Sequence, residues 1–123
     1  MTWFAAHIVI GMKRRDGIGP ISVYENVVLV EALSPSEARQ ISINMGKAEA
    51  EIDDTLTIGG QPAVRIFAGT RKIVNVSNPD SVDLDQDRPV SGTEITYSEF
   101  EVSDDAALQR FAHGETVEVR YLE

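Results

Sequence analysis

The most concentrated set of residues with metal-binding chemistry is an acidic run in the last third of the chain. Asp83, Asp85 and Asp87 occupy alternate positions, and Glu94 follows them. Their spacing matches positions 1, 3, 5 and 12 of a calcium-binding loop of about twelve residues, in which carboxylate oxygens surround a hard cation. Arg88 stands where such a loop needs glycine for its sharp turn, and no flanking helix is predicted. We therefore interpret the run as a solvated acidic loop, with a calcium site as the alternative.

The histidines and hydroxyl residues give little support to catalysis. His7 lies among apolar residues of a predicted strand, which favours a structural role, and His113 falls in the last turn of a predicted helix, where a positive charge suits the helix dipole. Neither has a partner at the spacing of a zinc site. Serines lie outside a G-x-S-x-G motif, and the absence of cysteine excludes thiolate chemistry. The sequence therefore predicts no catalytic residue and no cofactor.

The elements that position these residues begin with two strands and a helix. Apolar alternation from Trp3 to Ile10 predicts a strand with one hydrophobic face, and residues 22–33 form a second strand after a charged turn, so that the two make an antiparallel hairpin. Ser34, Pro35 and Glu37 are typical of a helix start. Gly46 is expected to weaken the middle of this helix by about 1 kcal/mol. Its predicted apolar stripe consists of Ala38, Ile41, Met45, Ala48 and Ile52.

Further strands and a short helix follow. Gly59-Gly60 breaks the chain before a strand region at 63–76, in which Gly69 indicates a bulge or bend. A loop at 77–93 precedes a strand at 94–102. Asp104 is expected to cap a short helix that runs to His113. Three residues of this helix should face inward: Leu108, Phe111 and Ala112. In the final strand Val117, Val119 and Tyr121 should be buried together.

These elements predict one α+β domain that spans residues 1–123. We expect an antiparallel sheet of about five or six strands, with one long helix on one face and a short second helix near the C-terminus. Residues 103–123 are expected to form a C-terminal helix–strand extension. Neither a signal-peptide pattern nor an apolar run long enough to span a bilayer is found, so we expect a cytoplasmic protein.

The charge of the chain is concentrated in its last third. The net charge is −9, and residues 80–123 carry twelve acids against three bases, whereas residues 1–79 are balanced. An acidic field repels phosphate backbones and anionic lipid, so we expect neither nucleic acid nor a membrane as a partner. It would attract a basic protein surface. The simpler interpretation, which we favour, is that the charge keeps a small protein soluble.

Five stretches of the chain together resemble a known family. They are Trp3-Phe4-Ala5, Tyr24 to Ala32, Ser36-Glu37-Ala38, Val64 to Gly69 and Gly92 to Ser98. In this order they are similar to a small bacterial and archaeal family, domain-of-unknown-function family 4288, over roughly residues 3–100. The tail from Asp104 to Glu123 extends beyond the usual end of that family, and Ala6 stands where the family would have lysine.

The resemblance implies a compact intracellular α+β domain without a known activity. It also implies that aromatic and carboxylate side chains recur at particular strand positions. We expect them to form one cross-strand binding cluster: Trp3, Tyr24, Glu25, Phe67, Glu94 and Tyr97. Aromatic residues on strands more often anchor cores or interfaces than perform catalysis.

Two functions from different classes are compatible with these observations. The first is a non-enzymatic protein-interaction module that binds a basic protein through its acidic surface, or a second copy through exposed strand edges. The alternative is a small-molecule binder or enzyme that uses Glu25, Glu94 and Tyr97 in a cleft between sheet and helix. We favour the interaction module, because no nucleophile–base pair can be argued from the spacing. A concave site with converging carboxylates would favour the alternative.

Overall fold

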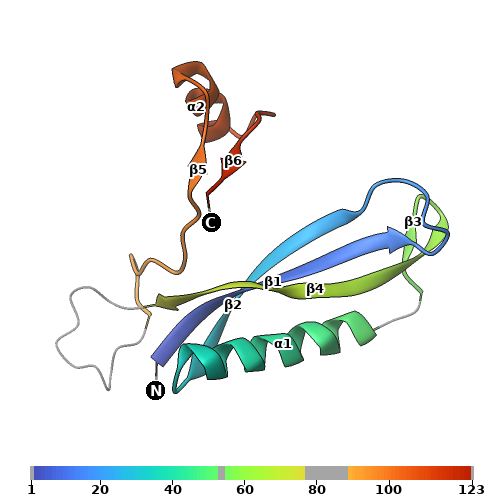
Figure 1. Ribbon diagram of the computed structural model, residues 1–123, viewed down its shortest axis with the longest axis horizontal. Helices are drawn as coiled ribbons and strands as arrows, with labels where there is room; N and C mark the ends of the chain where they lie inside the picture. Colours follow the sequence, from blue (N-terminus) through green and yellow to red (C-terminus); the bar gives the residue numbers. More distant parts are fainter. Residues whose placement is uncertain (1, 53–54, 77–88, 123) are drawn as a thin grey trace.

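The computed structural model describes residues 2–52, 55–76 and 89–122. Four strands form an antiparallel sheet in the order β2-β1-β4-β3, the helix α1 covers one face of this sheet, and β5 and β6 form a separate pair (Figure 1). The bounds are Thr2–Arg14 for β1, Ser22–Ala32 for β2, Pro35–Glu51 for α1, Thr57–Ile58 for β3, Gln61–Val76 for β4, Phe100–Glu101 for β5, Asp105–Ala112 for α2 and Arg120–Tyr121 for β6.

The central strand β1 divides the sheet into two chemically different faces. Phe4, Ala6, Ile8 and Ile10 are all buried on the face that packs against α1. His7 points to the opposite face, which we call the helix-free face, because side chains alternate along a strand. The predicted hairpin of β1 and β2 is confirmed, with the two strands in continuous antiparallel register. The expectation of an α+β fold with one long helix on one face is also confirmed.

The helix α1 begins as predicted, but it packs through a different stripe. The Ser34 side chain accepts a hydrogen bond from the backbone N–H of Glu37 at 3.1 Å, so the predicted cap is confirmed. The buried helix residues are the small ones, Ala38, Ser42 and Gly46. The predicted apolar stripe is wrong at Met45, Ala48 and Ile52, which are all exposed, because small side chains let the helix approach the sheet closely.

Gly46 is a point of close approach between α1 and the sheet. A methyl group added there would lie 2.3 Å from the Phe67 ring and 3.1 Å from Ile8. The absence of a side chain at this position therefore lets the Phe67 ring pack against the helix backbone. The sequence predicts a weak point at Gly46, whereas in the fold this glycine is required for packing.

The strand β4 is one long strand with two irregularities. Gly59 and Gly60 have positive φ values of 57° and 79° and form the tight turn between β3 and β4. The bulge predicted near Gly69 is confirmed. Val9 of β1 pairs with Gly69 and the next residue, Ile10, pairs with Phe67, so that β4 has one extra residue at this point. A second shift in the pairing of β1 with β4 lies between His7 and Ile8. His7 pairs with Lys72 and Ile8 with Thr70, so that Arg71 has no partner residue on β1. A bulge turns neighbouring side chains of the bulged strand toward the same side, which explains why both cations reach the helix-free face.

The C-terminal strands differ from the prediction. The expected strand at 94–102 is wrong except at β5, and the expected five or six strands are instead four in one sheet and two in another. The physical reason is that Thr96 and Tyr97 bind through side-chain and carbonyl contacts to the helix-free face, so this stretch does not pair along a sheet edge. The strand β5 pairs with β6 outside the four-stranded sheet.

The helix α2 forms where expected, with a different buried side. Asp104 caps it by accepting from the Ala107 N–H at 2.8 Å, and His113 is its C-cap residue. Ala107 is buried, whereas Leu108 and Phe111 are 49% and 42% exposed, so the predicted inward face is wrong. The final strand is shorter than expected, and its predicted joint burial is wrong: Val119 is 39% exposed, and Val117 and Tyr121 are only half-buried. Too few elements surround α2 and β6 to cover these side chains.

Candidate functional site

His7 lies at the centre of a polar network on the helix-free face. Its side chain is 2% exposed, and both ring nitrogens have partners. Nδ1 lies 2.9 Å from Oε1 of Glu25 on β2, and Nε2 lies 2.5 Å from the hydroxyl of Thr96. With the proton on Nδ1, the ring donates to Glu25 and accepts from Thr96. A buried imidazole needs such partners on both sides, because an unpaired buried polar atom is costly.

Glu25 connects this histidine to β4. Arg71 donates from Nη1 to Oε1 and Oε2 of Glu25 at 3.2 and 3.4 Å. Burial by itself would raise the pKa of Glu25, but hydrogen bonds from His7 and Arg71 outweigh burial and lower the pKa below its ordinary value. Glu25 therefore carries its negative charge at neutral pH, between two donors.

Two tyrosines close over the cations of the bulge. The Arg71 guanidinium lies 3.3 Å from the centroid of the Tyr121 ring, and the Lys72 ammonium lies 4.8 Å from that of Tyr97. Lys72 also donates to the backbone carbonyl of Tyr97. Cation–π contacts of this kind hold an aromatic ring over a positive charge. The network of His7, Glu25, Arg71, Lys72 and Thr96 thus fastens the C-terminal third of the chain to the sheet.

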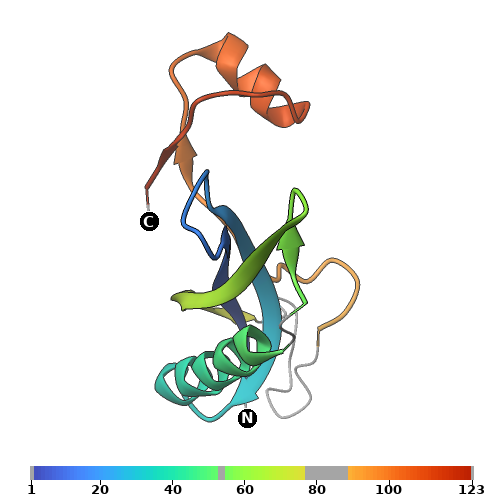
Figure 2. The ribbon, with the colours of Figure 1, turned by 90° about the vertical axis from the view of Figure 1, so that its right-hand side faces the viewer.

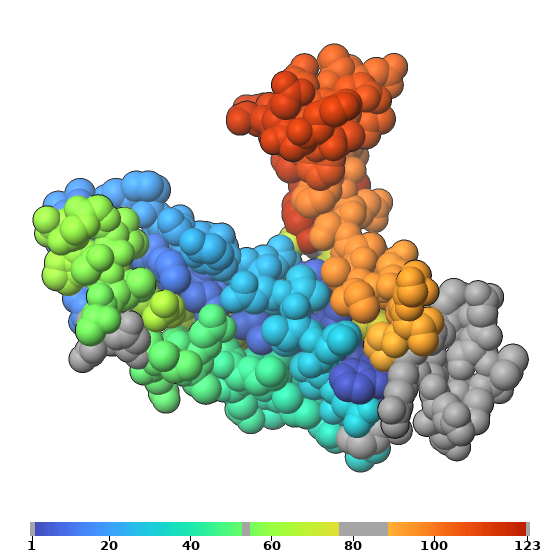
Figure 3. All heavy atoms as spheres, turned by 180° about the vertical axis from the view of Figure 1, so that it is seen from behind, coloured from blue at the N-terminus to red at the C-terminus, as the bar shows by residue number. Residues whose placement is uncertain are grey.

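The chain beyond the network projects from the sheet as an arm. We call residues 99–122, which include β5, α2 and β6, the C-terminal arm. Phe100 packs against Phe111 at 5.3 Å and against Tyr121 at 4.8 Å between ring centroids, which gives the arm a small aromatic core. We call the four-stranded sheet together with α1 the body. Figures 2 and 3 show the arm standing away from the body on the side of the helix-free face. Among the described elements, α2 contacts no strand of the four-stranded sheet.

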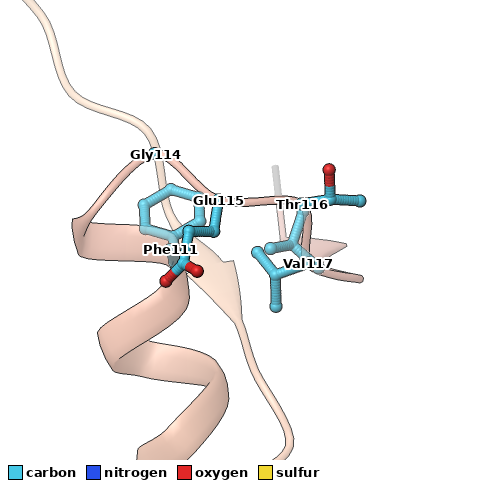
Figure 4. A pocket seen from close by; sticks show the side chains of 6 residues that line it. Phe111, Gly114, Glu115, Thr116 and Val117 are labelled. Carbon is cyan, nitrogen blue, oxygen red and sulfur yellow. The ribbon is translucent and has the colours of Figure 1, made fainter.

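The arm also carries a shallow pocket. It has a volume of about 440 Å³ and opens widely to solvent. Figure 4 shows the Phe111 and Val117 side chains beside it. Its lining residues are Phe111, Gly114, Glu115, Thr116, Val117 and Val119. None of the residues of the His7 network lines this pocket.

The predicted cluster of six residues is divided between the two faces of the sheet. Tyr24 and Phe67 both lie opposite Ile10 in the register, and therefore on the α1 side. Glu25 and Tyr97 belong to the helix-free face and are joined there through the cations of β4. The reason for the division is the strand alternation, which sends neighbouring residues such as Tyr24 and Glu25 to opposite faces.

Trp3 and Glu94 lie outside the network. Trp3 is half-buried near the start of β1, where it pairs with Glu31 and Val76 in the register. Glu94 is exposed in the segment that leads to Thr96. Among the residues that the structure describes, no hydrogen bond or ion pair joins either residue to Glu25.

Most of the predicted calcium loop lies outside the described residues. Asp83, Asp85 and Asp87 lie outside the described residues, and Glu94, which is described, is exposed. Within residues 2–52, 55–76 and 89–122, no group of three histidine or acidic residues lies close enough to hold a metal ion.

Three contributors to the network follow from no motif in the sequence: Thr96, Arg71 and Tyr121. The usable signal was Arg71-Lys72, a pair of consecutive cations in a strand and two residues after Gly69. Consecutive charges in a half-buried strand indicate a bulge, because regular alternation would bury one of them. The burial of His7 was predicted, but its partners were not.

Comparisons with family models, with curated proteins and with solved structures find no match for this chain. The resemblance to domain-of-unknown-function family 4288 therefore stays a prediction. None of the described helices has the length and apolarity needed to cross a membrane.

Proposed function

We propose that this protein acts by binding another protein through its C-terminal arm, and that it is not an enzyme. The observation that carries this proposal is the surface of the arm, where Leu108, Phe111, Val119 and Leu122 are each about two-fifths to one-half exposed. Apolar side chains gathered on a projecting element are characteristic of a binding surface. Their exposure would otherwise cost the protein solubility.

The charge of the arm suggests the character of its partner. The arm carries six acids and two bases. The acids are Glu99, Glu101, Asp104, Asp105, Glu115 and Glu118. Exposed acids on the same arm as exposed apolar side chains favour a partner with a basic surface, because opposite charges steer the encounter. We place this interaction in the cytoplasm.

A capture experiment with matched charge changes tests the proposal. The tagged full chain serves as bait in its own cell lysate at low and high salt, beside Asp105→Lys/Glu118→Lys and the control Glu31→Lys/Glu51→Lys. All four acids are exposed, and both variants change the net charge equally. Glu51 lies on α1, whereas Glu31 stands opposite Trp3 on β2, so the single variant Glu51→Lys is measured as well and separates an effect of the helix-free face from one of the arm. We expect a basic partner that is lost at high salt and with the arm variant. Equal capture by both variants would show that the arm is not the binding surface.

A second candidate function rests on the order Thr96–His7–Glu25. A hydroxyl, an imidazole and a carboxylate joined in this order resemble the arrangement that activates a nucleophile for acyl transfer. The measurement is hydrolysis of an activated ester by the wild-type chain, Thr96→Ala and the control Thr116→Ala. Turnover that is lost in Thr96→Ala alone would support an enzyme. Equal rates in all three proteins would eliminate this candidate.

A further inference from the structure

We infer that the arm binds a second copy of this chain, so that each arm lies over the helix-free face of the other copy. This inference rests on the proposed function and names its partner. A two-fold symmetric pair would use the same two surfaces twice, and the arrangement would therefore close without forming a filament.

The helix-free face offers an apolar surface that matches the arm. Val23, Val27 and Leu29 lie on this face of β2, because they stand opposite Gly11, His7 and Ala5 in the register. They are 65%, 40% and 41% exposed. In contrast to the α1 side, no described helix covers this part of the sheet. The arm of the same copy contacts the sheet through Tyr121 on Arg71 and then stands away from the sheet (Figures 1 and 3).

The charges of the two surfaces are complementary. The arm has an excess of four acids over bases, counted as six against two. The far end of the β1–β2 hairpin carries Lys13, Arg14 and Arg15 against the single acid Asp16. An arm that lies along the helix-free face toward this end would place its acids beside these cations. Among the described residues of one copy, no ion pair joins an acid of the arm to these cations, so a second copy can satisfy this attraction.

The arm has little internal packing of its own. Its strands β5 and β6 comprise two residues each, and Ala107 is the buried residue of α2. A two-stranded hairpin is marginally stable without a hydrophobic partner surface. Covering Leu108, Phe111 and the shallow pocket beside Val117 with the sheet of a second copy would supply that surface.

The first test is the mass of the full chain in solution. Light scattering coupled to size-exclusion chromatography, over a range of concentrations at low salt, should give twice the 13.5 kDa of one chain. We expect Leu108→Asp on the arm and Val23→Asp on the sheet each to weaken association by about tenfold or more, since both would bury a charge. Leu33→Asp is the control, because Leu33 is 73% exposed and lies on neither surface.

The second test identifies the geometry and avoids disruptive substitutions. The cysteine-free chain permits clean single cysteines, so Val27→Cys and Leu122→Cys chains of different tagged mass are mixed and treated with a short bismaleimide. Circular dichroism checks that each variant is folded. Arm exchange predicts a cross-link between the two different chains. A cross-link between two Val27→Cys chains instead would indicate pairing of β2 edges and would overturn the inference.

A monomer at every concentration would also overturn the inference. The proposed function would survive that result if the capture experiment still returned a salt-sensitive basic protein dependent on Asp105 and Glu118. If the chain is dimeric through its arms and captures nothing further, self-association is the binding function.

Discussion

Individual residues in this protein have effects whose sign depends on what lies against them. Gly46 is a poor residue for a helix interior, and alanine there would ordinarily stabilise a helix by about 1 kcal/mol. In this fold the space for a methyl group is occupied by Phe67, 2.3 Å from where it would lie. The same substitution is therefore unfavourable here.

We predict that Gly46→Ala lowers the free energy of unfolding by about 2 kcal/mol, because an overpacked interface must shift. Urea unfolding followed by circular dichroism measures this change. The double variant Gly46→Ala/Phe67→Leu should recover part of the loss, since leucine removes the ring atoms in conflict. A stabilised Gly46→Ala protein would show that α1 does not approach β4 as closely as the structure has it.

Glu25 should make the stability of the fold depend on pH. Its pKa is lowered in the folded protein, where hydrogen bonds from His7 and Arg71 outweigh the opposing effect of burial. A group with a lowered pKa contributes stability above its unfolded pKa, and this contribution is lost as the pH falls through the folded pKa. We therefore expect acid to weaken the attachment of Thr96 and Tyr121 to the sheet.

The measurement is urea unfolding at neutral pH and at pH values that protonate carboxylates. Glu25→Gln should be less stable than wild type at neutral pH and should lose less stability on acidification. Glu31→Gln, on the same strand and exposed, is the control for the general effect of removing an acid. If both variants show the same pH dependence as wild type, the protonation of Glu25 does not cause the loss of stability in acid.

At the scale of elements, local sequence signals are reliable where the chain makes its own contacts. Both helices begin at the predicted capping residues, Ser34 and Asp104, because a cap requires backbone groups only a few positions away. Which side of each helix is buried was predicted less well. That outcome depends on elements distant in sequence, as Met45 in α1 and Leu108 in α2 illustrate.

We predict that Asp104→Ala destabilises α2 by about 1 kcal/mol, because the Ala107 N–H loses its acceptor. Hydrogen exchange at the amides of α2 measures the effect directly. Asp105→Ala removes an acid from the first turn of the same helix without removing the cap, so its effect should be smaller. Equal effects of the two substitutions would show that charge, and not the cap, stabilises the start of this helix.

At the scale of the whole molecule, the attachment of the arm to the sheet depends on a few side chains. Arg71 contacts Glu25 on the body and Tyr121 on the arm, so that one guanidinium spans both parts. The arm adds the contact of the Tyr121 hydroxyl with Ser98 at 3.1 Å. The body, in contrast, is held by the extensive pairing of β1 with β2 and β4.

We predict that Arg71→Ala increases hydrogen exchange in residues 99–122 severalfold while exchange in β1 stays unchanged, because the backbone hydrogen bonds of β1 with β2 and β4 remain. Hydrogen exchange with mass spectrometry resolves the two regions. Arg65→Ala, on the same strand but bonded to the Ile52 carbonyl at 3.1 Å, is the control. Faster exchange throughout the chain would indicate that arm and body unfold as one unit.

The sequence by itself determined the features that depend on neighbouring residues. These include the β1–β2 hairpin, the caps at Ser34 and Asp104, the turn at Gly59-Gly60 and the bulge near Gly69. Strand alternation and helix capping depend on residues only a few positions apart in the sequence. The sequence pattern is therefore sufficient to predict these local structures. The acidic character of the arm is likewise a property of composition.

The tertiary structure alone decided which distant residues meet. Thr96, His7, Glu25 and Arg71 come from four separate stretches, and a second register shift in β4 turned Arg71 toward the others. No spacing rule links such residues, because their distance depends on strand order and on a bulge of a single residue. Tyr24 and Glu25 are separated for a different reason, because side chains alternate along β2 and place these two neighbours on opposite faces of the sheet.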